Sequence, residues 1–229
     1  MNDFAPIYAG LKAVLFDMDG VLTHNARFHE QAWQESLQQE YSVQIEKNSL
    51  VIHAGHTWEI LQKVLGGPVS AAETRRFHDL KERRYRELAQ GQLQPTSGLY
   101  GYLHWLKQQK LRTALVTGSD QTNAAFVLEA LGLEDAFEFQ ITAEQFQMGK
   151  PSPECYLLAL SKLGLTPEQV LVHEDSPGGV QAATRAGCQV IGLSTTTTPE
   201  NLRQNGAQWT VPDFENLLSE LQASRLQTQ

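Results

Sequence analysis

Residues 13–23 read Ala-Val-Leu-Phe-Asp-Met-Asp-Gly-Val-Leu-Thr, so an apolar run ends abruptly at two carboxylates, Asp17 and Asp19. Side chains of a strand alternate between its two sides, which would place residues 17 and 19 on the same side. At roughly 4 Å and an effective dielectric of about 20, two such charges repel by about 4 kcal/mol. The pair therefore needs a cation, a proton or a shifted pKa, although an ordinary Asp-Gly turn after a strand is the structural alternative.

Two more apolar runs end in polar residues. Residues 113–116 end at Thr117-Gly118-Ser119, and residues 170–172 end at His173-Glu174-Asp175. Between them, Lys150 precedes Pro151 at a corner that leads into a helix and aims one cation. Ligands of an open parallel sheet bind beyond the carboxyl ends of its strands. We therefore expect these acids, the hydroxyl group and the lysine to converge on one pocket.

Short apolar runs alternate with segments of helical periodicity, which predicts an α/β fold with a wound, mainly parallel sheet. The expected strands are residues 11–16, 113–116, 139–141, 170–172 and 189–193, with a weaker one at 209–211 before a helix at 214–221 and a polar turn at 195–198. The stretch 24–93 shows only helical patterns, at 28–40, 57–65 and 71–89. We predict a catalytic core of residues 1–23 and 94–229 and a helical cap of residues 24–93, with hinges where the two meet.

The composition suits a soluble globular enzyme. Of 229 residues, 41% are hydrophobic and 19% charged, and the formal net charge of −8 argues against a nucleic-acid partner. A basic cluster at residues 81–86 contains an acid and is expected to be a solvated helix face, with contact to a phosphorylated substrate as the alternative. Cys155 and Cys188 lack neighbours at metal-site spacing and are expected to be buried free thiols. The sequence has no signal-peptide pattern and no run of about 18 apolar residues, so we expect a cytoplasmic protein without a membrane partner.

In this order, the motifs resemble those of haloacid dehalogenase superfamily hydrolases, in the branch that includes beta-phosphoglucomutase and small sugar-phosphate phosphatases. The resemblance extends over residues 11 to about 221. It implies that Asp17 is the nucleophile, forming an aspartyl-phosphate, and that Asp19 is the general acid and base. It also implies a Mg²⁺ cofactor, held by Asp17, Glu174, Asp175 and the backbone carbonyl of Asp19.

The resemblance assigns phosphate or substrate binding to a second set of residues. These are Thr117, Gly118, Ser119 and Lys150 in the core, and His29, Lys81 and His56 in the cap. The hydroxyl group and backbone amides would hold phosphoryl oxygens, and Lys150 would balance the charge that spreads over them. For His29 and Lys81, an ordinary helix surface is the alternative. His53, near His56, could suggest a metal site, but a cap loop lining the pocket is the preferred interpretation.

Two further residues and one helix are given structural roles. Trp33 is expected in the core of the cap, and His173 is expected to pack rather than to bind metal. A helix is expected to start at Val180, after the Ser-Pro-Gly-Gly turn, with its N-terminal dipole facing the site.

One segment bears on the choice between phosphatase and mutase. Residues 55–61 contain no arginine, whereas beta-phosphoglucomutase relatives carry one there to grip a second phosphate. Losing a bidentate phosphate contact should harm a mutase more than a hydrolase. We therefore expect a Mg²⁺-dependent phosphatase acting on a small, sugar phosphate-like metabolite, as a monomer or weak homodimer. Beta-phosphoglucomutase activity and a non-catalytic phosphometabolite-binding module are the alternatives, and the substrate and the roles of His24 and Asp120 stay open.

Overall fold

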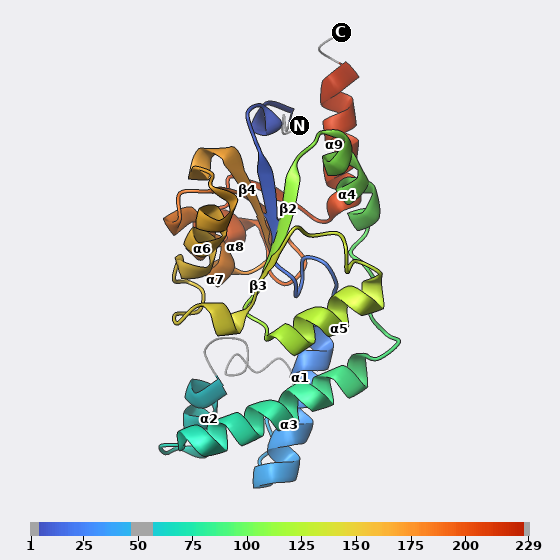
Figure 1. Cartoon of the computed structure of the whole chain (residues 1–229). Helices are drawn as coiled ribbons and strands as arrows, with labels where there is room; N and C mark the ends of the chain where they lie inside the picture. The colour runs from blue at the N-terminus through green and yellow to red at the C-terminus, as the bar shows by residue number, and fades with distance from the viewer. Residues whose placement is uncertain (1–4, 47–56, 227–229) are drawn as a thin grey trace. The chain divides into compact units, whose positions relative to one another are not determined.

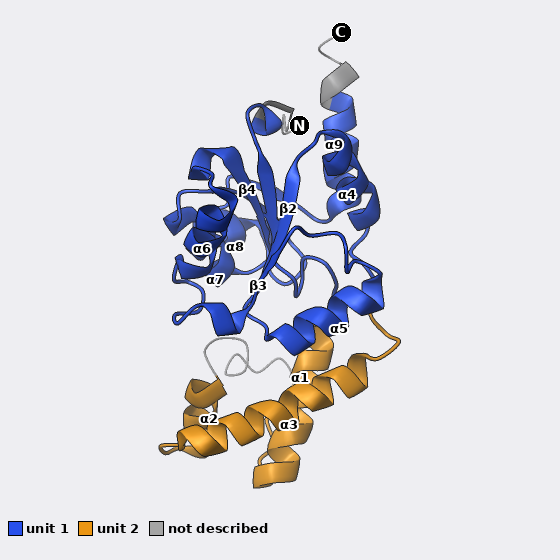
Figure 2. Cartoon of the chain, in the orientation of Figure 1, with its two compact units in different colours: residues 1–24, 94–229 blue, residues 25–93 orange. Residues whose placement is uncertain are grey.

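The computed structural model describes residues 5–46 and 57–226 (Figure 1). The chain divides into two compact units, one of residues 1–24 and 94–229 and the other of residues 25–93 (Figure 2). None of the helices in the described part of the chain combines the length and the apolar character needed to cross a membrane.

The first unit is built on a six-stranded parallel sheet with the strand order β3-β2-β1-β4-β5-β6. The strands are β1 (Ala13–Phe16), β2 (Arg112–Val116), β3 (Gln140–Ile141), β4 (Val170–Glu174), β5 (Gln189–Leu193) and β6 (Trp209–Val211). The predicted wound α/β fold is confirmed. Strand β4 extends two residues beyond the predicted end, because His173 and Glu174 continue the pairing with β5.

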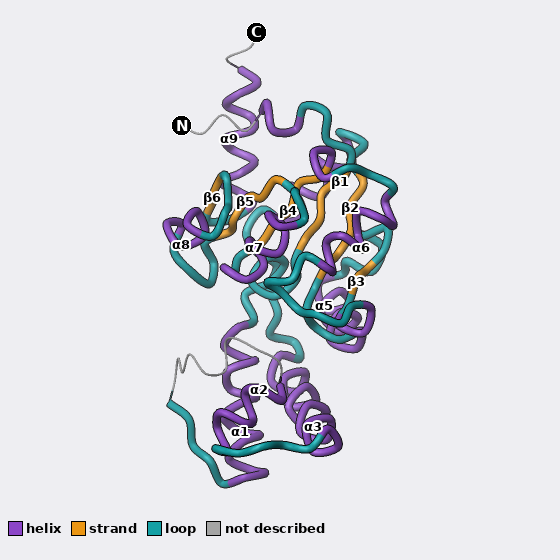
Figure 3. The backbone as a smooth tube through the Cα atoms, turned by 90° about the vertical axis from the view of Figure 1, so that its left-hand side faces the viewer, coloured by secondary structure: helices purple, strands orange, loops and turns teal. Residues whose placement is uncertain are grey.

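Strand β1 lies at the centre of the sheet and is buried on both faces, as expected for a parallel sheet covered by helices. Ala13 and Leu15 join an apolar cluster with α6 (Glu154–Leu163) and α7 (Pro177–Arg185). On the opposite face, the ring of Phe16 lies 6.0 Å from Tyr102 and 5.9 Å from Phe214. These residues belong to α4 (Leu99–Gln108) and α9 (Phe214–Leu226), so helices cover both faces of the sheet (Figures 1 and 3).

The remaining elements of this unit precede the first strand or connect the strands. They are η1 (Ala5–Tyr8), α5 (Gln121–Leu131), η3 (Ala143–Gln145), η4 (Pro167–Gln169) and α8 (Pro199–Gln204). Cys155 and Cys188 are buried free thiols, as predicted.

Helix α7 begins at Pro177, three residues before the predicted start at Val180. The Ser176 hydroxyl accepts a hydrogen bond from the Gly179 amide at 3.0 Å and caps the helix, and proline suits the first helical position. The two glycines, which the sequence analysis interpreted as a turn, therefore lie inside the first turn of the helix.

The second unit contains α1 (Ala26–Tyr41), α2 (Thr57–Leu65) and α3 (Ala71–Ala89) around an apolar core. Trp33 belongs to that core, as predicted. The basic cluster on α3 agrees only in part with the prediction of a solvated face, because Arg84 and Arg86 are partly exposed but two of its charged residues are not. Lys81 and Glu82 are buried, and Lys81 Nζ lies 2.8 Å from Glu82 Oε1. The ion pair with Glu82 offsets part of the desolvation cost of burying Lys81. Arg83, in contrast, is exposed.

The first unit holds together the two chain segments that lead to the second unit. The Thr23 hydroxyl donates to the Gln94 carbonyl at 2.7 Å, and the Thr96 amide donates to the Leu22 carbonyl at 2.9 Å. The chain thus leaves and re-enters the first unit through two hydrogen-bonded segments, at the places where the sequence analysis expected hinges.

Candidate active site

Three carboxylates gather at the carboxyl edge of the sheet. Asp17 follows β1, while Glu174 ends β4 and Asp175 follows it. Because β1 and β4 pair in parallel with Phe16 opposite His173, the next residues of both strands lie side by side. One oxygen from each of the three carboxylates lies within 4.8 Å of the others. The sequence motifs at these two strand ends therefore meet in space.

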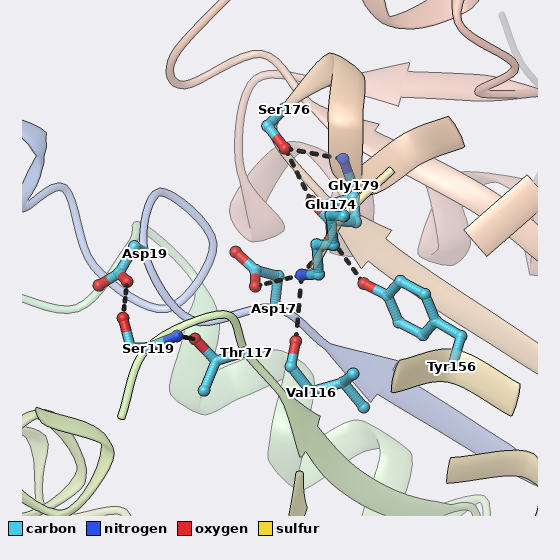
Figure 4. A network of polar contacts seen from close by, with 10 residues as sticks. Asp17, Asp19, Val116, Thr117, Ser119, Tyr156, Glu174, Ser176 and Gly179 are labelled. Carbon is cyan, nitrogen blue, oxygen red and sulfur yellow. Dashed lines mark hydrogen bonds and ion pairs between the residues drawn. The ribbon is translucent and has the colours of Figure 1, made fainter. Parts of the chain in front are cut away.

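Lys150 is the cation of this group. Its Nζ lies 2.6 Å from Asp17 Oδ1, 2.5 Å from Glu174 Oε1 and 3.2 Å from the Val116 carbonyl oxygen. Asp17, Glu174 and Val116 converge on this point from three neighbouring strands (Figure 4). An ammonium group has three protons, and these three acceptors match them. As placed, Lys150 joins Asp17 to Glu174.

Glu174 is completely buried, with 0% exposure, and is held on several sides. The Tyr156 hydroxyl donates to its Oε1 at 2.5 Å, and the Ser176 hydroxyl lies 3.4 Å from Oε2 (Figure 4). A Cβ atom on residue 179 would collide with the Glu174 carboxylate, so glycine is needed there. Tyr156 was not among the residues predicted for the site. Its place in the apolar pattern of α6 resembles a core residue, and only its need for a polar partner could have pointed to the site.

Asp175 is held by the neighbouring loops. Its exposure is 3%, and its Oδ2 accepts a hydrogen bond from the Thr196 hydroxyl at 2.6 Å. Gly20, with φ of +83°, passes so close that a side chain at this position would collide with the Asp175 carboxylate. This positive φ also favours glycine, so the turn after Asp19 and the end of β4 are fitted to each other.

Asp19 has a different partner from Asp17. Its Oδ2 accepts a hydrogen bond from the Ser119 hydroxyl at 2.7 Å, and the Ser119 amide donates to Thr117 Oγ1 at 3.0 Å (Figure 4). Strand β1 ends at Phe16, so the alternation of strand side chains does not extend to residue 19. Gly118 stands between these residues, and a Cβ there would meet no atom within 4 Å. The loop after β2 thus brings the Ser119 hydroxyl beside Asp19, with space around the backbone of Gly118.

Burial and like charge act together on the acids. Burial raises the pKa of Asp17 well above its usual range, and Lys150 opposes this shift while Glu174, Asp175 and Asp19 add to it. Burial also raises the pKa of Asp175 to about 7, with a further contribution from Glu174 and an opposing one from the Thr196 hydroxyl. Among the described residues, three carboxylates cluster here, and the Lys150 ammonium group contacts two of them. Carboxylate oxygens are ligands that Mg²⁺ accepts, so this donor set fits a divalent cation.

His173 lies on the other face of β4 from Glu174. It is fully buried, its ring lies 5.1 Å from Phe16, and its Nε2 lies 2.7 Å from the Tyr102 hydroxyl. Burial lowers the pKa of His173 to about 3, which leaves the ring neutral. The expectation that His173 packs is confirmed.

The predicted cap residues belong to the second unit. Lys81 Nζ lies 3.0 Å from His29 Nδ1, and the His29 ring stacks on Tyr85 at a centroid distance of 3.7 Å. Substrate contacts of His29 and Lys81 stay predictions. His53 and His56 lie outside the described residues.

Comparison with known proteins identifies the family. The model of the haloacid dehalogenase-like hydrolases matches residues 11–187. The chain belongs to this family. One relative of this haloacid dehalogenase-like hydrolase is a phosphorylated carbohydrates phosphatase of Thermotoga maritima. The two sequences are 34% identical, over 79% of this chain and 84% of the relative. A beta-phosphoglucomutase of Bacillus subtilis is 29% identical over 80% of the chain and 83% of the relative.

Solved structures agree with this assignment. The crystal structure of CbbY from Rhodobacter sphaeroides in complex with phosphate superimposes with a TM-score of 0.80 and 25% identity, over 93% of this chain and 99% of that one. The sequence motifs that resembled the haloacid dehalogenase superfamily are thus supported by both sequence and structure, and the predicted family is confirmed.

Proposed function

We propose that this hydrolase is a Mg²⁺-dependent phosphatase acting on a small phosphorylated sugar. One observation carries the proposal: one carboxylate oxygen each of Asp17, Glu174 and Asp175 lies within 4.8 Å of the others, beside Lys150, whose side chain is 13% exposed. The three carboxylates carry more negative charge than Lys150 can balance, and one of them, Asp17, is the proposed nucleophile. Bound Mg²⁺, held by Asp17 and Asp175 with Glu174 contributing directly or through water, would offset this charge and that of the substrate's phosphoryl group.

In the first half of the reaction, a carboxylate oxygen of Asp17 attacks phosphorus and the bond from phosphorus to the ester oxygen breaks. Asp19 gives its proton to the departing alkoxide, which leaves as an alcohol. The hydrogen bond from the Ser119 hydroxyl holds the Asp19 carboxyl group beside the loop after β2. Thr117 and the Gly118 amide, in that same loop, are the candidates for contacting the phosphoryl oxygens.

In the second half, Asp19 takes a proton from water, and the water oxygen attacks the phosphorus of the aspartyl-phosphate. The bond between phosphorus and Asp17 breaks, which releases inorganic phosphate and restores both carboxyl groups. Lys150 Nζ lies 2.6 Å from Asp17 Oδ1, a contact that would help to keep the nucleophile in position between the two steps. The helical unit, residues 25–93, is proposed as a cap that selects the substrate and excludes bulk water.

The substrate class is proposed from the relatives. One of them is a phosphatase of phosphorylated carbohydrates, and another is a beta-phosphoglucomutase. Both names concern sugar phosphates, and the carboxylate group described above suits the transfer of a phosphoryl group in either reaction. Hydrolysis is favoured because residues 55–61 carry no arginine for a second phosphate.

The test is to supply a panel of sugar phosphates with Mg²⁺ and to measure inorganic phosphate, with Asp17→Asn as the matched control. Release of phosphate by the wild type, lost in the variant, is the expected result. With beta-glucose 1-phosphate, formation of glucose 6-phosphate instead of free phosphate would show a mutase. Tight binding of the esters without turnover would indicate a phosphometabolite-binding module.

A further inference from the structure

The loop after β5 contacts both acidic loops of the site, although neither the sequence motifs nor the proposed mechanism uses it. The Thr195 hydroxyl donates to the Gly20 carbonyl at 2.6 Å. The Thr196 Oγ1 lies 2.6 Å from Asp175 Oδ2 and 2.9 Å from the Asp175 carbonyl oxygen. Two adjacent hydroxyl groups therefore connect the turn after β1 with the end of β4.

The Thr196 hydroxyl donates a hydrogen bond to the buried carboxylate of Asp175. Asp175 is nearly fully buried, and the group around it carries like charge. Within the part of the chain that the structure describes, the side-chain donor that contacts its carboxylate is the Thr196 hydroxyl. A buried carboxylate depends on such donors to keep one orientation. The bond to Oδ2 limits rotation of the carboxylate, so its remaining lone pairs keep one direction.

Backbone packing holds Thr196 in this position. A Cβ atom built on Gly20 would lie 3.0 Å from Thr196 Cγ2, so the methyl group of the threonine packs against the glycine turn. The adjacent Thr195 hydroxyl donates to the carbonyl of the same glycine, which further ties this loop to the turn. The threonine side chain thus has both of its branches engaged, which limits its rotation.

We propose that Thr196 is a positioning residue for the metal site: its hydroxyl fixes Asp175 so that one carboxylate oxygen is presented to Mg²⁺ together with Asp17. This inference rests on the proposed function, because it assumes that these carboxylates bind Mg²⁺. Residues that orient metal ligands through hydrogen bonds typically change metal affinity by about 10- to 100-fold when they are removed.

The test is calorimetric titration of Mg²⁺ into the metal-free full-length protein, without substrate. Thr196→Val keeps the shape of the side chain and removes the hydroxyl, and it should raise the dissociation constant for Mg²⁺ by about 10- to 100-fold. Thr196→Ser keeps the hydroxyl and should restore binding. Thr197→Val is the matched control, because the Thr197 hydroxyl oxygen contacts the Asn201 side chain at 2.9 Å instead of an acid of the site. Thermal unfolding in EDTA checks that the variants are folded.

Each outcome decides the matter. Weaker Mg²⁺ binding in Thr196→Val, with normal binding in the serine and Thr197 variants, supports the inference. Equal binding by Thr196→Val and wild type overturns it, and so does an equal loss in Thr196→Val and Thr197→Val. A wild type that binds Mg²⁺ but hydrolyses no sugar phosphate refutes the proposed function alone, whereas a wild type that binds no Mg²⁺ refutes the metal site itself.

Discussion

Replacing Lys150 by methionine should strongly destabilise the metal-free protein. The lysine side chain is 13% exposed and forms ion pairs of 2.6 Å with Asp17 and 2.5 Å with Glu174. Methionine fills most of the space of the aliphatic stem but leaves both carboxylates without their cation. Removing one partner of a buried ion pair costs about 3–5 kcal/mol. This corresponds to a fall of roughly 100- to 5,000-fold in the ratio of folded to unfolded protein.

The loss should depend on pH in a defined direction. The folded-state pKa of Asp17 is raised by burial and by the neighbouring acids despite the presence of Lys150, and removing the lysine raises it further. An acid with a raised folded-state pKa favours the folded state while it is protonated, and this contribution is lost as the pH rises through that pKa. The penalty of Lys150→Met should therefore be smaller at about pH 5.5 than at about pH 8.

The measurement is urea unfolding in EDTA at these two pH values, followed by circular dichroism. Arg112→Met is the control, because Arg112 forms a bidentate pair with Glu138, at 2.7 and 2.6 Å, on the partly exposed surface. Such a surface pair contributes about 0–1 kcal/mol. Equal losses in the two variants, or a Lys150→Met penalty that does not change with pH, would refute the reasoning.

Three further predictions concern the same site. Tyr156→Phe removes the hydroxyl group that donates to Glu174 and should cost about 1–3 kcal/mol in urea unfolding, more than Tyr100→Phe, whose hydroxyl contacts a backbone carbonyl of the partly exposed surface. Gly179→Ala should displace the Glu174 carboxylate and reduce the rise in melting temperature that Mg²⁺ produces, and an unchanged rise would contradict the close packing. Because the pKa of Asp175 is raised to about 7, protons should compete with Mg²⁺, so that this rise in melting temperature is larger at about pH 8 than at about pH 5.5.

The sequence determined the elements whose signal is local. Strands at 189–193 and 209–211 and helices at 57–65 and 71–89 have the predicted bounds. Periodic apolar residues identify such segments because each element buries one face or stripe, whatever it packs against. The sequence also predicted that the polar residues after these strands would meet, since a parallel sheet brings the carboxyl ends of its strands to one edge.

Local patterns were misleading where a distant residue decides the environment. The pair of glycines after Ser176 suggested a turn, but both lie in α7, where Gly179 leaves room for the Glu174 carboxylate. The charged residues of α3 suggested a solvated face, but Lys81 and Glu82 are buried as a pair. In both cases, a partner supplied by folding changed the meaning of the residue type.

Only the tertiary structure decided which groups hold the acids in place. Tyr156 and Thr196 lie 18 and 21 residues from the carboxylates that they contact, on a helix and a loop whose sequences give no sign of the site. The sequence predicted that Lys150 would lie near the acids, but only folding brings its Nζ to 2.6 Å from Asp17, across 133 residues of chain. A hydrogen bond or an ion pair depends on distances of a few ångströms between elements, and these follow from strand order and register, which hydrophobic periodicity alone does not specify.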